Sequence, residues 1–266
     1  MNSETEQFRK RITELSDISY TNSQYIFTDF LTEAEISDLL SMAGNAADRI
    51  SSGETVICPA FQSGITLYGG HENATRKIAR FGSEEAFAYN EDFHITIVHI
   101  APRLAKFADK FTHRDFLGAI LNLGIDRKVT GDIVINSNEA YLFCEEKIAE
   151  FISENLDKVK HTYVKAETVE TIPESIMPHM EDVEFQVSSE RIDAIVSHMA
   201  NLSRSKAIEL FRTGKVFVNG RQMENTSFQP KEGDMISVRG FGKIKYLGVS
   251  RTTRKGKLNI VVSRFV

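Results

Sequence analysis

The sequence has little cysteine and no long apolar run, and both absences narrow the classes of protein to consider. Its 266 residues include only Cys58 and Cys144, which lie far apart and outside any C-x-x-C pair. They give neither a disulfide framework nor a zinc site, and they fit a reducing compartment. Because no stretch could span a bilayer and the polar segment 1–11 lacks a signal-peptide core, we expect a cytoplasmic protein without a membrane partner.

Signatures of several enzyme classes are also missing. None of the 16 glycines forms a G-x-G-x-x-G turn, the seven histidines show no metal-ligand spacing, and no P-loop, nucleophile elbow or H-E-x-x-H occurs. His113 lies near Asp115, but neighbours in the first turn of a helix point in different directions, so we predict that Asp115 caps the helix. We therefore expect no catalytic residue, no metal and no cofactor.

Charge is divided unevenly along the chain. Residues 183–266 contain 15 Lys and Arg against 7 Asp and Glu, a formal charge of +8, whereas residues 1–182 contain 17 against 30, a formal charge of −13. The segment 235–266 has no acidic residue at all. A basic block of this kind attracts polyanions because it neutralises phosphates and releases counterions. The overall charge of −5 therefore hides a C-terminal segment suited to nucleic acid.

Length and periodicity predict three small domains of the α+β class. In the first, Thr32 and Glu35 form a capping box before an amphipathic helix. The second shows the order βαββαβ, the ferredoxin-like arrangement that RNA-recognition modules also use. Pro173 and Pro178 mark a linker before the third. The predicted division is an N-terminal α/β domain at 1–70, a ferredoxin-like domain at 71–170, a linker at 171–182 and an RNA-binding module with a basic hairpin at 183–266.

The central domain departs from an RNA-recognition motif at the positions where bases would stack. Its first expected strand, 94–99, has no Phe, Tyr or Trp, and its third has only Tyr141 and Phe143, without the glycine or basic residue of the signature. We therefore predict that Tyr141 and Phe143 pack against the core or a neighbouring domain. His113 and Arg114 are the candidates for a second binding surface.

The basic block predicts two short helices followed by a hairpin. An apolar stripe marks a helix at 192–199, and Ser203 is the expected N-cap of a second helix that has Arg204 and Lys206 in its first turn. Because cations oppose the helix dipole there, we predict that backbone N–H groups, serine hydroxyls and these cations bind a phosphate. Asn219-Gly220 is a type I′ hairpin signal.

These segments together resemble the S-four RNA-binding domain, also called the alpha-L motif. The segments in question are Arg191-Ile192-Asp193, Ser203-Arg204-Ser205-Lys206-Ala207, Gly214-Lys215-Val216-Phe217-Val218-Asn219-Gly220 and Gly233-Asp234-Met235-Ile236. The resemblance implies that the helix pair and the hairpin bind structured RNA through its shape and phosphates. Asp193 is similar in context to the aspartate of a pseudouridine synthase, but its place at the start of a helix of the module favours a structural role.

The RNA contacts that we predict form two patches. The first patch consists of Arg191, Arg204, Ser205, Lys206, Arg212, Lys215, Asn219 and Arg221. The second lies at the tip of a further hairpin and consists of Arg251, Arg254, Lys255 and Lys257. Lysines can also protect an edge strand from aggregation, but here the charge gathers at the tip, which favours RNA contact.

Nearly the whole chain resembles the YlmH-type proteins of Gram-positive bacteria. The segments that carry the resemblance are Thr28-Asp29-Phe30-Leu31-Thr32, Gly69-Gly70, Phe111-Thr112-His113-Arg114-Asp115-Phe116-Leu117-Gly118-Ala119, Leu123-Gly124-Ile125, Gly131-Asp132-Ile133 and Gly248-Val249-Ser250-Arg251. The resemblance implies a non-enzymatic protein that binds rRNA or tRNA on the ribosome, helps to rescue stalled large subunits that carry peptidyl-tRNA, and has a link to cell division.

Two alternatives stay open at this point. The chain could be an RNA-modifying enzyme such as a pseudouridine synthase, because modules of this kind are often attached to catalytic domains. It could also be an interaction protein whose acidic first two domains bind a protein partner such as a cell-division component.

Overall fold

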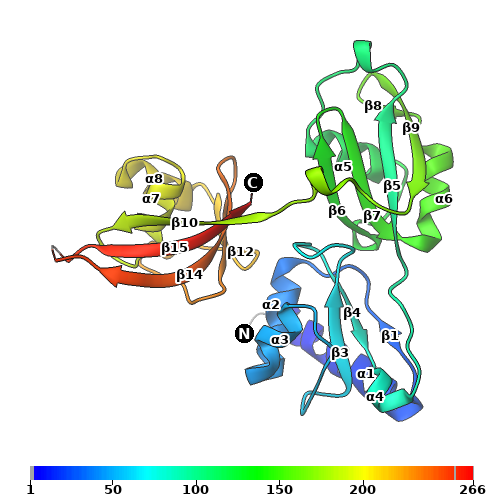
Figure 1. Ribbon diagram of the computed structural model, residues 1–266, viewed down its shortest axis with the longest axis horizontal. Coiled ribbons are helices and arrows are strands. Elements are labelled where there is room, and N and C mark those ends of the chain that lie inside the picture. The colour runs from blue at the N-terminus through cyan, green and yellow to red at the C-terminus, as the bar shows by residue number, and fades with distance from the viewer. Residues whose placement is uncertain (1–2, 255, 266) are drawn as a thin grey trace. The chain divides into compact units, whose positions relative to one another are not determined.

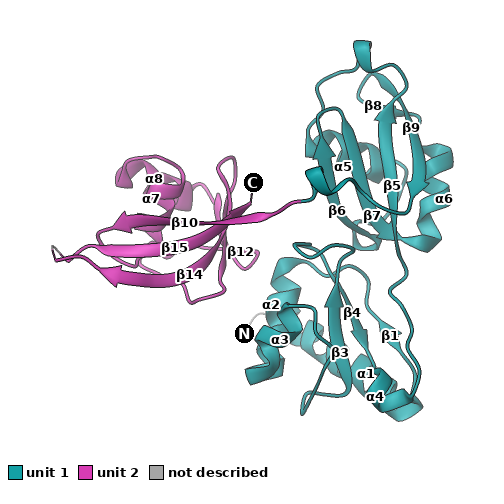
Figure 2. Cartoon of the chain, viewed as in Figure 1, with its two compact units in different colours: residues 1–177 teal, residues 178–266 magenta. Residues whose placement is uncertain are grey.

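The computed structural model describes residues 3–254 and 256–265. The chain divides into two compact units, Met1–Met177 and Pro178–Val266 (Figure 1, Figure 2). The described residues form an α+β structure with three antiparallel sheets, two in the first unit and one in the second. The division lies within the segment predicted as a linker, and the predicted domain boundary near residue 70 stays a prediction.

The N-terminal part of the first unit is a four-stranded sheet with helices. Its elements are α1 (Ser3–Asn22), β1 (Ile26–Phe27), α2 (Glu33–Ala43), η1 (Gly44–Ala46), α3 (Ala47–Ser51), β2 (Val56–Cys58), β3 (Phe61–Tyr68), β4 (Ile78–Phe81) and α4 (Glu84–Phe87). The sheet order is β1-β4-β3-β2. The predicted capping box is confirmed, because the Thr32 N–H donates to Glu35 Oε2 at 2.8 Å. Helix α1 was not predicted, because its buried positions are mostly small polar residues around Ile12.

The central part of the first unit has the predicted βαββαβ order. Its elements are β5 (Ile95–Pro102), η2 (Ala105–Phe107), α5 (His113–Leu121), η3 (Arg127–Val129), β6 (Thr130–Asn136), β7 (Glu139–Glu145), α6 (Glu146–Asn155), β8 (Lys158–Val159), β9 (Thr162–Val169) and η4 (Glu174–Ile176). The sheet order is β6-β7-β5-β9-β8. Phe116 and Ile120 of α5 and Ile152 of α6 share one core with β5 and β7, so both helices cover the same face.

The opposite face of this sheet is also covered by protein. Tyr141 and Phe143 are 8% and 1% exposed, and they pack with Ile172 and Ile176 of the segment after β9. A Cβ placed on Gly70 would lie 2.2 Å from Phe143 Cδ1, so the Gly69-Gly70 turn also lies directly against this ring. The prediction that both aromatic side chains pack against protein is confirmed, and neither offers a free ring to an RNA base.

The second unit is a six-stranded sheet with two helices. Its elements are β10 (Met180–Val187), α7 (Ile192–Met199), α8 (Arg204–Arg212), β11 (Val216–Val218), β12 (Arg221–Gln222), β13 (Met235–Val238), β14 (Gly242–Thr252) and β15 (Leu258–Phe265). The sheet order is β10-β15-β14-β13-β11-β12. The predicted linker is too long at its end, because Met180 already pairs with Phe265. The hydrophobic alternation of β10 starts only at Val183, which hid the first residues of the strand.

The predicted hairpins of the second unit are confirmed. Asn219 and Gly220 both have positive φ, 47° and 72°, as a type I′ turn requires, and Val218 pairs with Arg221 across it. Strands β14 and β15 form the long second hairpin. None of the helices among the residues that the structure describes is long and apolar enough to cross a membrane.

Candidate nucleic-acid interface

A buried carboxylate holds two of the predicted RNA contacts. The side chain of Asp193 is 1% exposed and accepts hydrogen bonds from both arginines of the pair. Arg204 donates from Nε and Nη2 at 2.8 and 3.0 Å, and Arg191 donates from the same atoms at 3.1 and 3.3 Å. Burial by itself raises the pKa of Asp193, but the hydrogen bonds from Arg204 and Arg191 bring it below its usual value. Asp193 thus joins the start of α7 to the start of α8.

The ion pair between Arg204 and Asp193 removes the reason for predicting a phosphate at the start of α8. The cation at Arg204 is explained by Asp193, so its opposition to the helix dipole no longer calls for an external anion. Ser203 takes the extended backbone of an N-cap but makes no side-chain cap bond, and its Oγ instead lies 3.1 Å from Ser205 Oγ. The sequence could not distinguish these outcomes, because the partner of Arg204 lies 11 residues away on another helix.

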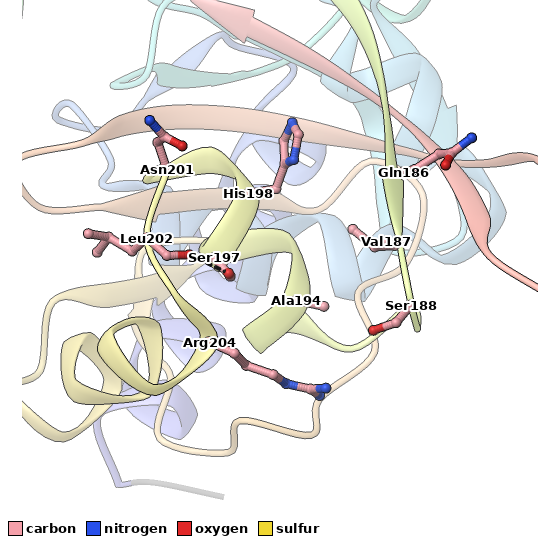
Figure 3. A pocket seen from close by; sticks show the side chains of 9 residues that line it. All are labelled: Gln186, Val187, Ser188, Ala194, Ser197, His198, Asn201, Leu202 and Arg204. Atoms are coloured by element: carbon pink, nitrogen blue, oxygen red, sulfur yellow. Dashed lines mark hydrogen bonds between the residues drawn. The ribbon is translucent and has the colours of Figure 1, made fainter.

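A pocket of about 540 Å³ opens beside this ion pair (Figure 3). Its lining includes Ser197, His198 and Asn201 from α7 and the following loop, Arg204 from α8, and the end of β10. The His198 ring stacks on Phe185 at 4.0 Å, and partial burial lowers the pKa of His198. The polar lining of this pocket suits a hydrated polar group more than an apolar ligand.

The other predicted contacts of the first patch fall into two kinds. Lys206, Lys215 and Arg221 are exposed on α8, on the turn after it and on β12. Arg212 is exposed too, but its Nη1 lies 3.7 Å from Glu209 Oε2. Asn219 holds the hairpin instead of facing outward, because its Nδ2 donates to the Asp234 carboxylate at 2.7 Å and its Oδ1 accepts from the Met235 N–H at 2.8 Å.

Lys206 and Lys215 are the least compensated cations of the first patch. Among residues 3–254 and 256–265, no carboxylate lies within 4.0 Å of either ammonium group. The Lys215 carbonyl accepts from the N–H of Arg239, whose guanidinium lies 4.6 Å from the centre of the Phe217 ring. Arg239 was missed in the sequence because it lies outside the family-like segments.

The second patch lies at the turn between β14 and β15. Arg254 and Lys257 are exposed there, and the Thr253 N–H donates to the Lys257 carbonyl at 2.7 Å, which closes the turn. Arg251 lies 3.8 Å from Glu184 of β10, so part of its charge is compensated. Lys255, which we also predicted as a contact, lies outside the described residues.

The predicted second surface lies at the start of α5. His113 and Arg114 are both exposed, as expected. The N–H and Oγ1 of Thr112 each donate to Asp115 Oδ2 at 2.7 Å, which confirms that Asp115 caps the helix. Hydrogen bonds from Lys160 and Thr112 lower the pKa of Asp115 to about 2. Asp115 Oδ2 thus serves the helix end and Lys160.

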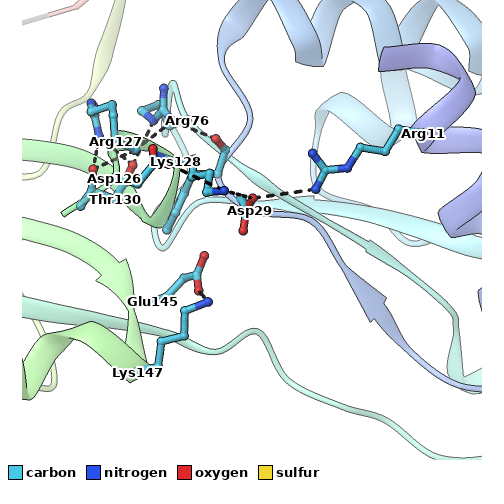
Figure 4. A network of polar contacts seen from close by, with 10 residues as sticks. Arg11, Asp29, Arg76, Asp126, Arg127, Lys128, Thr130, Glu145 and Lys147 are labelled. Atoms are coloured by element: carbon cyan, nitrogen blue, oxygen red, sulfur yellow. Dashed lines mark hydrogen bonds and ion pairs between the residues drawn. The ribbon is translucent and has the colours of Figure 1, made fainter. Parts of the chain in front are cut away.

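Two arginines that the sequence did not single out, Arg76 and Arg127, lie next to each other (Figure 4), and Arg127 is close enough to His113 to affect its pKa. Arg76 donates from Nε to the Thr130 carbonyl at 3.0 Å, and from Nη2 to the carbonyls of Phe30 at 2.8 Å and Arg127 at 3.3 Å. Arg127 donates from Nη1 to the carbonyls of Thr130 and Gly131 at 2.7 and 2.9 Å. Neither guanidinium has a carboxylate within 4.0 Å among the residues that the structure describes. The two residues are 51 positions apart, so no local pattern could have joined them.

A buried carboxylate and a buried imidazole lie next to these arginines. Asp132 accepts from the N–H and Oγ1 of Thr75 at 2.6 and 2.7 Å, and His71 Nε2 is 3.6 Å from Asp132 Oδ2. Burial alone raises the pKa of Asp132, whereas His71 and the Thr75 hydrogen bonds bring it below its usual value. Although His113 is exposed as a whole residue, desolvation of its ring by the protein around it and the neighbouring charge of Arg127 lower the pKa of His113. Residues of several family-like segments therefore meet in one place.

Comparisons with known proteins place the chain in a family. Residues 89–172 match a family described as "Putative RNA-binding domain in YlmH". The chain is 30% identical over 243 residues to the "Ribosome-associated protein quality control protein P2" of Bacillus subtilis, covering 89% of this chain and 86% of the relative. The solved "Cell division protein ylmH from Streptococcus pneumoniae" is 16% identical with a TM-score of 0.45, covering 64% of this chain and 93% of that chain.

Proposed function

Because this chain belongs to the YlmH family, we propose that it is a non-enzymatic RNA-binding protein that acts in ribosome-associated quality control. The RNA that we propose is structured rRNA or tRNA on the large ribosomal subunit. The name of the Bacillus subtilis relative supports the link to quality control. The second unit acts as an S-four module with a basic hairpin, and the central part of the first unit binds no base through its covered sheet face.

The observation that carries this proposal is that exposed lysines of the helix pair and hairpin lack a neighbouring carboxylate. Lys206 and Lys215 have no carboxylate within 4.0 Å in the described part of the chain, although seven acidic residues occur in the same block. Uncompensated cations on an S-four-like surface suit the phosphates of a structured RNA.

The geometry of Asp193 argues against the pseudouridine synthase alternative. A catalytic aspartate of such an enzyme must reach a nucleobase, but the Asp193 side chain is 1% exposed. Both of its oxygens also accept hydrogen bonds from Arg191 and Arg204. A carboxylate fixed in this way stabilises the module and does no chemistry on a base.

The test compares charge-reversal variants in binding to large ribosomal subunits by sedimentation. We choose Lys206→Glu/Lys215→Glu and leave Arg204 unchanged, because a glutamate there would face buried Asp193 and unfold the module. Loss of two phosphate contacts should weaken binding by roughly 10- to 100-fold at 0.1 M salt, and should lower the slope of log affinity against log salt by about 1.5.

The control variant changes the same amount of charge in the first unit. Lys10→Glu/Lys158→Glu replaces two exposed lysines of α1 and β8 and should leave ribosome binding within about twofold of wild type. If both double variants bind like wild type at every salt concentration, the proposal that the second unit anchors the protein on RNA is wrong.

A further inference from the structure

We propose that Arg76 and Arg127 form a phosphate-binding site in the first unit, which gives the protein a second contact with RNA. The ligand is a phosphate group of an RNA strand, held by two guanidinium groups at the start of β6. The inference rests on the proposed function only for the source of the phosphate, because the site itself lies outside the S-four-like unit.

The two arginines are anchored on backbone carbonyls and keep N–H donors that these carbonyls do not use. Arg76 uses Nε and Nη2 on backbone carbonyls and leaves Nη1, while Arg127 uses Nη1 and leaves Nε and Nη2. These three remaining nitrogens have no acceptor among the described residues and are not sealed from solvent. Because the carbonyls fix each planar group, its free N–H donors are already oriented for an oxyanion.

The charge around the site is only partly balanced by the protein. Arg76 and Arg127 are neighbours, and burial together with the charge of Arg76 lowers the pKa of Arg127 to about 10, although the charge of Asp132 acts in the opposite direction. Asp132 is the carboxylate that acts on both arginines, and it lies beyond 4.0 Å from either guanidinium in the described part of the chain. Two half-buried cations that share one more distant carboxylate retain an excess positive charge, which a bound phosphate would offset.

One further donor, His113, lies near Arg127. Exposed Arg114 and His113 lie at the start of α5, and His113 is close enough to Arg127 for the two charges to interact. On the buried side, His71 Nε2 faces the Asp132 carboxylate at 3.6 Å, so this histidine supports Asp132 and does not serve as a donor to the site. Figure 4 shows Arg76 and Arg127 side by side, drawn from segments that are distant in sequence.

RNA is the ligand that the rest of the molecule favours. Guanidinium forks bind carboxylates as well as phosphates, so an acidic peptide has similar chemistry. The exposed lysines of the second unit, however, already suit a polyphosphate chain. A strand that contacts both units would gain affinity without any new contact in either one, because the second binding event becomes intramolecular.

The test uses the full-length protein with Arg127→Gln and measures affinity for large-subunit rRNA as a function of salt. Loss of one phosphate contact should reduce affinity about fivefold at 0.1 M salt and lower the salt slope by about 0.7 to 0.9. The matched control is Arg103→Gln, because Arg103 is anchored on the Val164 carbonyl in the same way but has Asp157 3.6 Å away. That variant should bind within twofold of wild type.

Two further measurements decide between the remaining outcomes. Arg127→Lys keeps the charge without the fork and should recover only part of the affinity, and it serves if the glutamine variant does not fold. The side-chain N–H signals of Arg76 and Arg127 in wild type are followed by NMR during titration with inorganic phosphate, an acidic peptide and rRNA. They should move with phosphate and with rRNA but not with chloride.

Several results would overturn the inference, and one of them would leave the proposed function intact. If Arg127→Gln keeps wild-type affinity and slope while Lys206→Glu/Lys215→Glu loses binding, the site is wrong and the anchoring by the second unit stands. If inorganic phosphate moves the arginine signals but Arg127→Gln binds rRNA normally, the phosphate comes from a free small molecule. If only the acidic peptide moves them, the ligand is a protein.

Discussion

The two pairs of arginines in this molecule show opposite uses of the same side chain. In the second unit, Arg191 and Arg204 converge on the carboxylate of Asp193, which is 1% exposed. In the first unit, Arg76 and Arg127 converge on backbone carbonyls, which carry no net charge. Arg191 and Arg204 share one negative charge and join two helices, whereas Arg76 and Arg127 are held by uncharged groups and keep N–H donors that no described residue accepts. What an arginine can bind is therefore set by the group that anchors it.

The difference matters because a family motif reports residue types and not their partners. Arg191 and Arg204 belong to the S-four-like segments, yet much of their hydrogen-bonding capacity serves Asp193. Lys206, two positions after Arg204 on α8, has no carboxylate partner of this kind in the described part of the chain. Substitutions that remove Asp193 or displace the turn before Arg76 test whether the anchoring group decides what each arginine can bind.

The largest effect is expected from Asp193→Ala. The substitution leaves two guanidinium groups without their shared carboxylate and should lower the free energy of unfolding of the second unit by about 3 kcal/mol. Glu209→Ala is the control, because Glu209 pairs with Arg212 on the exposed face of α8 and should cost less than about 1 kcal/mol. Hydrogen exchange resolved by peptide measures each unit separately, and equal losses in the two variants would contradict the structural role of Asp193.

Much of the architecture could be predicted from local patterns, while the sites depended on contacts between distant segments. The capping box at Thr32, the βαββαβ order and the Asn219-Gly220 turn were predictable because propensity and periodicity determine them within a few residues. Helix α1 was not, because its buried face carries mostly small polar residues. Strand β10 was hidden because its first residues lack alternation and gain their order by pairing with β15.

The candidate sites divide in the same way. Exposure of Lys206 and Lys215 followed from their places beside apolar stripes, so the sequence was sufficient there. The anchoring of Arg204 by Asp193 and the meeting of Arg76 with Arg127 are long-range contacts without a periodic signal. A single sequence carries no local signal for contacts between distant segments. For this reason the pair formed by Arg76 and Arg127 in the first unit was not predicted.

The next largest effect concerns the turn that precedes His71, Thr75 and Arg76. Gly70 has φ +96°, and a Cβ there would lie 2.2 Å from Phe143 Cδ1, so Gly70→Ala should destabilise the first unit by about 2 kcal/mol. Gly44→Ala separates the two causes, since Gly44 has φ +57° but open space around its Cβ. Because its ψ of −124° lies outside the left-handed helical region, the cost of about 1 to 3 kcal/mol there comes from the backbone conformation alone.

The same Gly70 variant should also weaken the proposed phosphate site if the turn positions Arg76. Thermal unfolding measures the stability change, and the NMR titration with inorganic phosphate measures the site. A variant that is as stable as wild type would show that the contact between the turn and Phe143 yields without cost.

A smaller effect, the loss of stability at low pH, is expected from Asp193, which only the pair Arg191 and Arg204 contacts. Since the pKa of Asp193 is lower in the folded than in the unfolded protein, its contribution is complete above about pH 4, the usual aspartate value, and is lost as the pH falls through the folded value. The second unit should therefore lose stability below about pH 4. Asp193→Asn should flatten that part of the curve, which denaturant unfolding between pH 2 and 6 measures. An unchanged curve in the variant would show that other carboxylates dominate.

The smallest expected change is a gain. Gly118 lies inside α5, and a Cβ there would meet nothing within 4 Å, so Gly118→Ala should stabilise the first unit by about 0.5 to 1 kcal/mol. Gly124 also has open space but φ +83°, so Gly124→Ala should destabilise the unit, and the pair isolates backbone conformation from packing. Because backbone carbonyls of β6 and its flanks hold the arginine forks, a stiffer α5 should leave rRNA affinity unchanged. A loss of affinity in Gly118→Ala would mean that α5 itself, through His113 and Arg114, sets the geometry of the phosphate site.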